Sequence, residues 1–273
     1  MEKPTTKLPE FQYPPVIETV LGVQFEPLPK FNISHLGLYW HRIRERYPDS
    51  DIQPPLGSVT EAFGSDSKRA PSFGIEFVQA PDVRCWFIAP QKTELIQVQR
   101  DRFIVNWRKV AGDEVYPRYS WFKPRFVDEW SRFKQFLHDE GLGDPVVNQA
   151  EVTYVNHFDM GKEWKSFGDL PKVLSVWRGE GSQSFLPAPE FVQINNRYEL
   201  PDQSGRLHVL LQPGIRRRDA KELLQLTLTA RGKPKPSDLD GVLKFFDLGH
   251  EWIVNGFTDL TTSEMHKLWR KSL

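Results

Sequence analysis

The sequence has a single cysteine, no apolar run long enough to span a membrane, and no excess of charge of either sign. Cys85 has no second thiol for an intramolecular disulfide, which is typical of a reducing compartment, and we interpret it as a packed side chain. The 36 Lys and Arg residues balance 36 Asp and Glu residues, so no overall field attracts polyanions. The N-terminus lacks the apolar core of a signal peptide. We therefore expect a soluble, cytoplasmic protein.

The sequence also lacks recognisable catalytic and metal-binding motifs. It contains no nucleophile-elbow, P-loop or dinucleotide-binding pattern, and no two of its seven histidines have metal-site spacing beside another ligand. His157 at a strand end and His208 within a strand are the candidates for catalysis, although a structural role is more common for such histidines. We assign no catalytic residue, expect no cofactor and no bound metal, and favour a protein that is not an enzyme.

Aromatic side chains, by contrast, are abundant. Nine Trp and nineteen Phe among 273 residues, with 39% hydrophobic and 26% charged residues, are enough for a core of more than one packed layer. A chain of this length forms one large domain or two domains of ordinary size.

The stretch from Glu94 to Arg108 has the pattern of an antiparallel hairpin, because two β-rich runs flank the polar pair Arg100-Asp101. A two-residue loop sets three facing pairs: Gln99 and Arg102, Gln97 and Ile104, Leu95 and Asn106. Side chains then alternate between two faces. The expected core face holds Ile96, Val98, Phe103, Val105 and Trp107. Amides and guanidinium groups stand out on the other face, which holds Leu95, Gln97, Gln99, Arg102, Ile104, Asn106 and Arg108. Arg-Asp is not a favoured tight turn, so a longer loop with a shifted register is the alternative.

The first half of the chain predicts a strand, a helix, several antiparallel strands and a helix. Residues 1–15 are rich in proline and predict a surface arm, and residues 48–71 predict a long loop. Strands are expected over 16–26, 73–79, 84–89 and the hairpin. The first helix is capped by Asn32 or Ser34, and the second is marked by Phe126, Trp130, Phe133 and Leu137.

The second half repeats this order. A strand is expected over 146–158, then a helix over 164–177 that Pro171 bends or interrupts. Three strands follow over 191–199, 206–212 and 223–231. A long helix capped by Ser237 or Asp238 and a short last helix end the chain.

We therefore predict an α+β protein in which two β-α-β(3–4)-α repeats form one curved antiparallel sheet with the helices on one face. The expected divisions are an N-terminal arm (1–15), a first half (16–143) and a second half (144–273). The halves share architecture without obvious sequence identity. One feature is shared: the amide side chains Gln97 and Gln99 of the first half correspond to the amide side chains Gln193 and Asn195 of the second. The helix-free face would therefore carry amides from both halves.

Five short segments carry a resemblance to a known family: PPVIE at 14–18, LIQVQ at 95–99, NWR at 106–108, YPRY at 116–119 and TYVN at 153–156. Together they resemble a sporadically distributed bacterial protein family of similar length and unknown function. The resemblance spans most of the chain, and it implies a bacterial cytoplasmic protein without an assigned reaction. The doubled order of elements is also similar to TATA-binding-protein-like and helix-grip domains, in topology alone, which does not decide function.

The helix-free face and the cleft between the halves are the expected binding surfaces. Amides both donate and accept hydrogen bonds, and an arginine can hold a carboxylate or phosphate with two parallel bonds. The candidate ligand-binding residues are Gln97, Gln99, Asn106, Arg108, Gln193, Asn195 and His157. The alternative, slightly favoured for such side chains, is that they tie strands to loops, since buried polar groups must be paired. The expected function is non-catalytic binding of a protein segment or a small polar ligand.

Two further functions stay open. An enzyme acting on a phosphorylated or nucleotide-like substrate in the same cleft would use Arg108 with His157 or His208. Glu18 and Glu151 could also meet across adjacent strands as a carboxylate pair for acid–base work.

A nucleic-acid-binding protein would instead use the basic cluster Arg216–Arg218. This cluster is soon offset by Asp219 and Glu222, and the chain has no basic excess, so nucleic acid is not favoured as a partner. A membrane partner is not expected.

Overall fold

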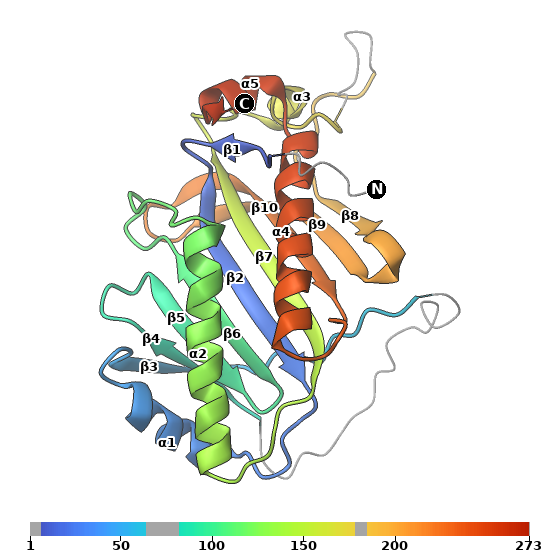
Figure 1. The fold of residues 1–273 in the computed structure, drawn as a ribbon. Helices are drawn as coiled ribbons and strands as arrows, with labels where there is room; N and C mark the ends of the chain where they lie inside the picture. The colour runs from blue at the N-terminus through green and yellow to red at the C-terminus, as the bar shows by residue number, and fades with distance from the viewer. Residues whose placement is uncertain (1–6, 64–81, 178–184, 273) are drawn as a thin grey trace.

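The computed structural model describes residues 7–63, 82–177 and 185–272 and has an α+β fold built on one large antiparallel sheet (Figure 1). Within the described residues this sheet has nine strands, in the order β3-β4-β5-β6-β2-β7-β10-β9-β8. The strands are β2 (Val16–Phe25), β3 (Asp49–Gln53), β4 (Arg84–Ile88), β5 (Glu94–Gln99), β6 (Arg102–Arg108), β7 (Val147–Asp159), β8 (Ile194–Glu199), β9 (Gly205–Arg216) and β10 (Lys221–Gly232). The predicted fold class is confirmed.

The first strands of the two halves, β2 and β7, pair antiparallel at the centre of the sheet, with Leu21 opposite Val152. Outward from this centre, β2 is followed by β6, β5 and β4, and β7 is followed by β10, β9 and β8. Each half therefore places its last strand beside its first. The predicted superposition of the two halves stays a prediction.

Helices cover one face of this sheet: α1 (Ile33–Ile43), α2 (Tyr119–Asp139) and α4 (Leu239–Leu260). In Figure 1, α2 and α4 run side by side across the sheet, and the rings of Phe126 and Phe246 meet edge to face with centroids 4.8 Å apart. The short helices α3 (Leu170–Val173) and α5 (Ser263–Leu268) lie at one end of the sheet. No helix in the described part of the chain is long and apolar enough to cross a membrane.

Two of the predicted helix caps are present. The Asn32 side chain accepts a hydrogen bond from the Ser34 N–H at 3.0 Å and starts α1. The Asp238 carboxylate accepts one from the Gly241 N–H at 2.9 Å and starts α4. Each cap pairs a backbone donor that the first helical turn leaves free.

Aromatic side chains fill the layer between helices and sheet. Phe103 on β6 stacks on Phe133 of α2 with centroids 5.0 Å apart and also contacts Trp130. The hairpin β5–β6 has the predicted two-residue loop and register, with Gln97 opposite Ile104. Its predicted core face is buried in this layer: Ile96, Val98, Phe103, Val105 and Trp107.

Part of the predicted loop over 48–71 is a strand instead. Asp49–Gln53 forms β3 at the edge of the sheet and pairs with β4, with Ser50 opposite Phe87. Most of its side chains are exposed, so backbone pairing defines the strand and no hydrophobic alternation reveals it. The strand predicted over 73–79 lies outside the described residues.

Other predicted elements are shorter or more ordered than expected. The helix predicted over 164–177 is reduced to the 3₁₀ turn η2 (Phe167–Asp169) and α3, with Pro171 in the first turn of α3, where its missing N–H breaks no helical bond. The predicted arm is held in part, because β1 (Glu10–Phe11) pairs with β11 (Lys271–Ser272). A second 3₁₀ turn, η3 (Pro201–Gln203), precedes β9.

Candidate functional site

The amides of the hairpin lie on the helix-free face, but they are buried in a hydrogen-bonded network. The Gln97 Oε1 atom accepts from the Arg84 guanidinium at 2.6 Å and from the Trp86 indole at 2.9 Å. The Gln97 Nε2 atom donates to Asn106 at 2.7 Å, and Asn106 donates to Glu18 at 2.6 Å. Burial raises the pKa of Glu18, and the hydrogen bond from Asn106 opposes that shift. The network ties β2, β4, β5 and β6 together.

Residues 54–63, hereafter the covering segment, lie across this face. The side-chain amide of Gln99 forms two hydrogen bonds with the backbone of Leu56: it accepts from the Leu56 N–H at 2.8 Å and donates to the Leu56 carbonyl at 3.0 Å. The Arg102 guanidinium donates to the Gly57 carbonyl, and Gln24 accepts from the Val59 N–H at 3.1 Å. The chain therefore closes over part of the surface that we expected to be open.

The far end of the covering segment is held by the second half. Glu61 accepts from Arg206 at 2.7 Å and from the His208 imidazole at 2.6 Å. Burial alone would raise the pKa of Glu61, but the hydrogen bonds from His208 and Arg206 bring it below its usual value. His208, a candidate for catalysis, is thus engaged in a hydrogen bond that anchors this segment.

Gln97, Gln99 and Asn106 are no more than 6% exposed. This geometry favours the alternative that they tie strands and loops together. Gln193 and Asn195 are exposed at the other edge of the sheet, Gln193 before β8 and Asn195 within it opposite Leu210. Because β5 and β8 are separated by five strands, the two matched pairs are not brought together.

The proposed carboxylate pair is not formed. Glu18 lies opposite Val155 and Glu151 lies opposite Gly22, so the two carboxylates are out of register by four residues on β2. Glu151 accepts from Arg231 at 2.6 Å instead. The expectation that Glu18 and Glu151 meet is wrong because the register between β2 and β7 sets the two residues four positions apart along β2.

Arg108 and His157 meet the basic cluster Arg216–Arg218 around one cavity of about 790 Å³. This cavity, hereafter the cleft, lies between the loop 109–115 of the first half and the tip of the β9–β10 hairpin of the second half. Its volume is within the range of small-molecule sites. The structure therefore brings together three features that the sequence placed far apart.

The first-half wall of the cleft is a tight loop. Glu114 accepts from the backbone N–H groups of Val110 at 3.0 Å, Ala111 at 2.8 Å and Gly112 at 2.7 Å. Burial opposes ionisation of Glu114, but these donors bring its pKa to about 2. Gly112 has φ +106°, a conformation that glycine adopts most readily. The loop is thus held in place by its own carboxylate.

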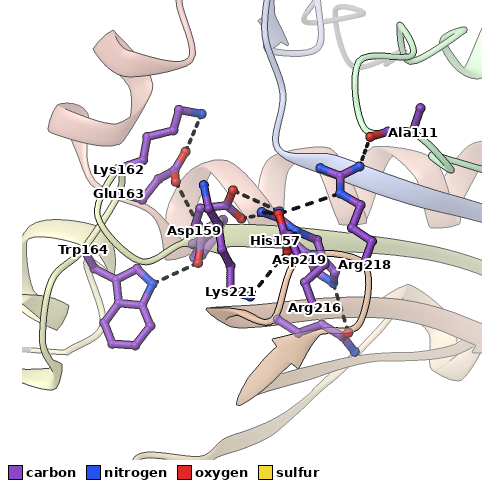
Figure 2. Close-up of polar contacts among 12 residues, drawn as sticks. Ala111, His157, Asp159, Lys162, Glu163, Trp164, Arg216, Arg218, Asp219 and Lys221 are labelled. Atoms are coloured by element: carbon purple, nitrogen blue, oxygen red, sulfur yellow. Dashed lines mark hydrogen bonds and ion pairs between the residues drawn. The ribbon is translucent and has the colours of Figure 1, made fainter.

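The second-half wall is held by ion pairs, which Figure 2 shows around Arg216. The Arg216 guanidinium contacts Asp159 at 2.8 and 2.9 Å and Asp219 at 2.9 Å through two further bonds. The hydrogen bond from Arg216 lowers the pKa of Asp219 to about 2. Arg218 reaches across the cleft and donates to the Ala111 carbonyl (Figure 2).

Two cationic side chains in the cleft remain available to bind a ligand. Within the described residues, neither the Arg217 guanidinium nor the Lys109 ammonium has a hydrogen-bond or ion-pair partner. Burial lowers the pKa of Lys109, which Glu114 partly opposes. The cleft is lined by six cationic side chains against four carboxylates, counting Lys162 and Glu163, which pair at 2.8 Å. This local positive excess contrasts with the neutral balance of the whole chain.

His157 forms part of the cleft and lies beside Gln225. Its Nε2 atom is 3.2 Å from the Gln225 Oε1 atom. Burial lowers the pKa of His157, which favours the neutral imidazole, and the hydrogen bond to Gln225 opposes this shift. Arg108 donates to the Lys92 carbonyl at 3.1 Å and lies over the Trp86 ring at 5.3 Å.

A second cavity of about 430 Å³ lies between the central strands and the helices α2 and α4. Tyr116, Tyr154 and His250 line it, and none of them was selected from the sequence. A signal was present, because His250 lies on an apolar helix stripe and Tyr154 on a strand, and buried polar tips need partners. No group of three or more metal-ligating side chains occurs in the described ranges.

The arrangement can bind an anion in the cleft and an apolar molecule in the second cavity. Comparison with known proteins adds no assignment: no family model, no curated protein and no solved structure matches the chain.

Proposed function

We propose that this protein is a non-catalytic binding protein whose cleft takes a small anionic ligand bearing phosphate or carboxylate groups. The observation that carries the proposal is the pair of unpartnered cations, Arg217 and Lys109, beside the fully paired Arg216 in the same cavity. A small polar ligand is favoured over a protein segment because the covering segment already occupies part of the helix-free face.

The chemistry of the cleft suits a compact anion. A guanidinium group presents paired donors that match two oxygens of a phosphate or carboxylate, and an ammonium group adds a point charge. Arg217 would supply the first contact and Lys109 the second. Lys109 is half-buried, so an anion also relieves the cost of keeping an ammonium group charged with little water around it.

His157 and Arg108 complete the proposed site. A neutral imidazole can donate or accept a hydrogen bond, which suits a ligand hydroxyl as well as a phosphate oxygen. The roles of Arg216 and Arg218 are to hold the walls, since their guanidinium groups are already bound to Asp159, Asp219 and the Ala111 carbonyl.

Isothermal titration with pyrophosphate tests the proposal. We expect saturable binding that weakens as sodium chloride is raised, because salt screens the attraction. Arg217→Ala should weaken binding by about tenfold or more, since a hydrogen bond to a charged group contributes about 1.5–3 kcal/mol. Arg197→Ala is the matched control, because Arg197 is exposed on β8 away from the cleft.

Two results would refute the proposal. The first is the absence of saturable binding for pyrophosphate, inorganic phosphate and citrate at millimolar concentrations. The second is equal weakening by Arg217→Ala and Arg197→Ala, which would make the attraction a general surface effect.

The second candidate function is catalysis on a phosphorylated or nucleotide-like substrate. The presence of His157 and Arg108 in the same cavity favours it. Release of inorganic phosphate from p-nitrophenyl phosphate or from ATP by the wild-type chain, lost in His157→Ala, would establish this function. Binding without turnover supports the non-catalytic function.

Nucleic-acid binding through Arg216–Arg218 has less support. Asp159 and Asp219 occupy Arg216, and the Ala111 carbonyl occupies Arg218, so one arginine of the cluster is left for a phosphate backbone. A gel-shift assay with single-stranded and double-stranded oligonucleotides tests this function, and retention of either that weakens as sodium chloride is raised would favour it.

A further inference from the structure

The second cavity, hereafter the tyrosine pocket, has an apolar wall and a polar corner. Its wall is formed by side chains of the N-terminal segment, β2 and α4, including Phe11, Val16, Ile253, Val254 and Phe257. Its polar corner is formed by Tyr116, Tyr154 and His250. At about 430 Å³ it is nearly three times as large as a cavity of about 150 Å³ that holds benzene.

The polar corner is a chain of three hydrogen-bonding groups. The hydroxyl oxygens of Tyr116 and Tyr154 are 2.7 Å apart, and the Tyr154 hydroxyl is 3.0 Å from the His250 Nδ1 atom. Tyr119 fixes the imidazole, because the two rings stack with centroids 4.0 Å apart at an interplanar angle of 11°. The Tyr119 hydroxyl in turn donates to Asp247 at 2.9 Å.

The hydrogen bonds among these three groups can be oriented in either of two directions. In each orientation the Tyr116 hydroxyl keeps one hydrogen-bond donor or acceptor without a partner. If Tyr154 donates to His250, then Tyr116 donates to Tyr154 and its own oxygen can still accept. If His250 donates to Tyr154, then Tyr154 donates to Tyr116, whose hydrogen has no acceptor within the described residues. A hydroxyl group on a ligand satisfies both cases because it both donates and accepts.

Charge also limits the ligand. Burial lowers the pKa of His250 to about 4, and it raises the pKa of Tyr116 to about 12, so the polar corner is neutral at pH 7. Arg118, which also lines the pocket, already donates to the Phe11 carbonyl at 2.9 Å and lies 5.6 Å from the Tyr116 ring centroid. Glu10, also in the lining, offsets the formal charge of Arg118. The pocket thus favours a neutral molecule.

We infer that the tyrosine pocket binds an apolar molecule of about two fused rings that carries one hydroxyl group, which hydrogen-bonds to Tyr116. The apolar body lies against Phe11, Ile253 and Phe257. This site does not depend on the proposed function of the cleft, although Pro14 and Tyr116 contribute to both cavities.

The test uses 2-naphthol and naphthalene, two probes of nearly equal size that differ by one hydroxyl. Naphthalene is the more apolar, so a purely apolar cavity would prefer it. We expect 2-naphthol to bind the full chain about fivefold more tightly, the ratio given by a net hydrogen bond of about 1 kcal/mol. Probe fluorescence against protein concentration gives both dissociation constants.

Four variants test whether the preference for 2-naphthol arises in the tyrosine pocket. Tyr116→Phe should bring the two probes to about equal affinity, whereas Tyr198→Phe, which removes an exposed hydroxyl on β8, should keep the preference. Val254→Trp, which fills the pocket, should abolish binding of both probes. Arg217→Ala in the cleft should leave both affinities unchanged, which separates this site from the proposed function.

The inference is overturned by equal affinity for the two probes in the wild-type chain, or by no saturable binding of either. It is also overturned if Tyr116→Phe keeps the preference for 2-naphthol. Thermal melts of each variant establish that the chain is folded. If Tyr116→Phe does not fold, Val254→Trp decides, because undiminished binding of 2-naphthol would place the probe elsewhere.

Discussion

Gln97 is the side chain whose replacement should most clearly separate a structural tie from a ligand contact. Gln97→Ala removes three hydrogen bonds: two accepted from Arg84 and Trp86, and one donated to Asn106. Asn106 is 3% exposed and would keep an unpaired oxygen, and the Arg84 Nε atom already lacks a partner within the described residues. Arg84 and Trp86 are half-buried and can recover contacts with water.

The expected cost follows from these exposures. A buried polar group left unpaired costs about 1–3 kcal/mol, and the groups that regain water cost less. We therefore expect Gln97→Ala to lower the free energy of unfolding by about 2–3 kcal/mol. Gln193→Ala is the matched control, because that glutamine is exposed and should change stability by about 0.5 kcal/mol or less.

Urea unfolding followed by tryptophan fluorescence measures both variants, with slopes compared to confirm a common unfolding transition. Equal stability of Gln97→Ala and Gln193→Ala would refute the reasoning. It would mean that the network around Gln97 contributes little and that the face is free for a ligand after all.

Three further predictions each concern one residue. Phe103→Ala should cost about 3–5 kcal/mol in urea unfolding, because it removes a ring packed on Phe133 and Trp130, and a loss below about 1 kcal/mol would contradict that packing. Glu61→Gln should speed hydrogen exchange at the Leu56 and Val59 amides, as the covering segment loses its ion pair with Arg206, while unchanged exchange would show that Gln99 and Gln24 hold it alone. Burial lowers the folded-state pKa of His250 to about 4, below its usual value of 6.5. Its contribution to stability is therefore complete above pH 6.5 and is lost as pH falls from 6.5 to 4, by about 3 kcal/mol in all. His250→Gln should flatten the pH dependence of stability in that window relative to the wild-type chain, and superimposable profiles would contradict the shift.

The hairpin could be predicted in detail because one face of it is apolar throughout. Alternation from Ile96 to Trp107 admits a single register that buries all five apolar side chains, and the structure has that register. The helices α1 and α4 could also be predicted, because Asn32 and Asp238 are strong caps followed by apolar stripes.

Elements without an apolar face could not be predicted in this way. β3 is exposed along most of its length, and it is a strand because its backbone pairs with the backbone of β4 at the edge of the sheet. The covering segment has no periodicity at all, and the side chains that hold it, including Gln99 and Glu61's partner Arg206, are distant in sequence. Its position is a tertiary effect.

The candidate site shows the same limit. Arg108 and His157 were selected from the sequence for one expected cleft, whereas Arg216–Arg218 was selected for a different function, nucleic-acid binding. Their meeting in the cleft depends on the order of strands around β2 and β7 and on the loop 109–115 reaching the β9–β10 hairpin. The sequence did not indicate Lys109 as a site residue, because a lysine that follows a strand is usually exposed to solvent.

The most direct test of the account is to locate an anion in a crystal. Crystals of the full chain soaked in tungstate, a heavy analogue of phosphate, give an anomalous difference map that places the anion without a fitted model. The account predicts a peak in the cleft within about 4 Å of the Lys109 ammonium and the Arg217 guanidinium. A strongest peak at an exposed arginine such as Arg197, with none in the cleft, would contradict it.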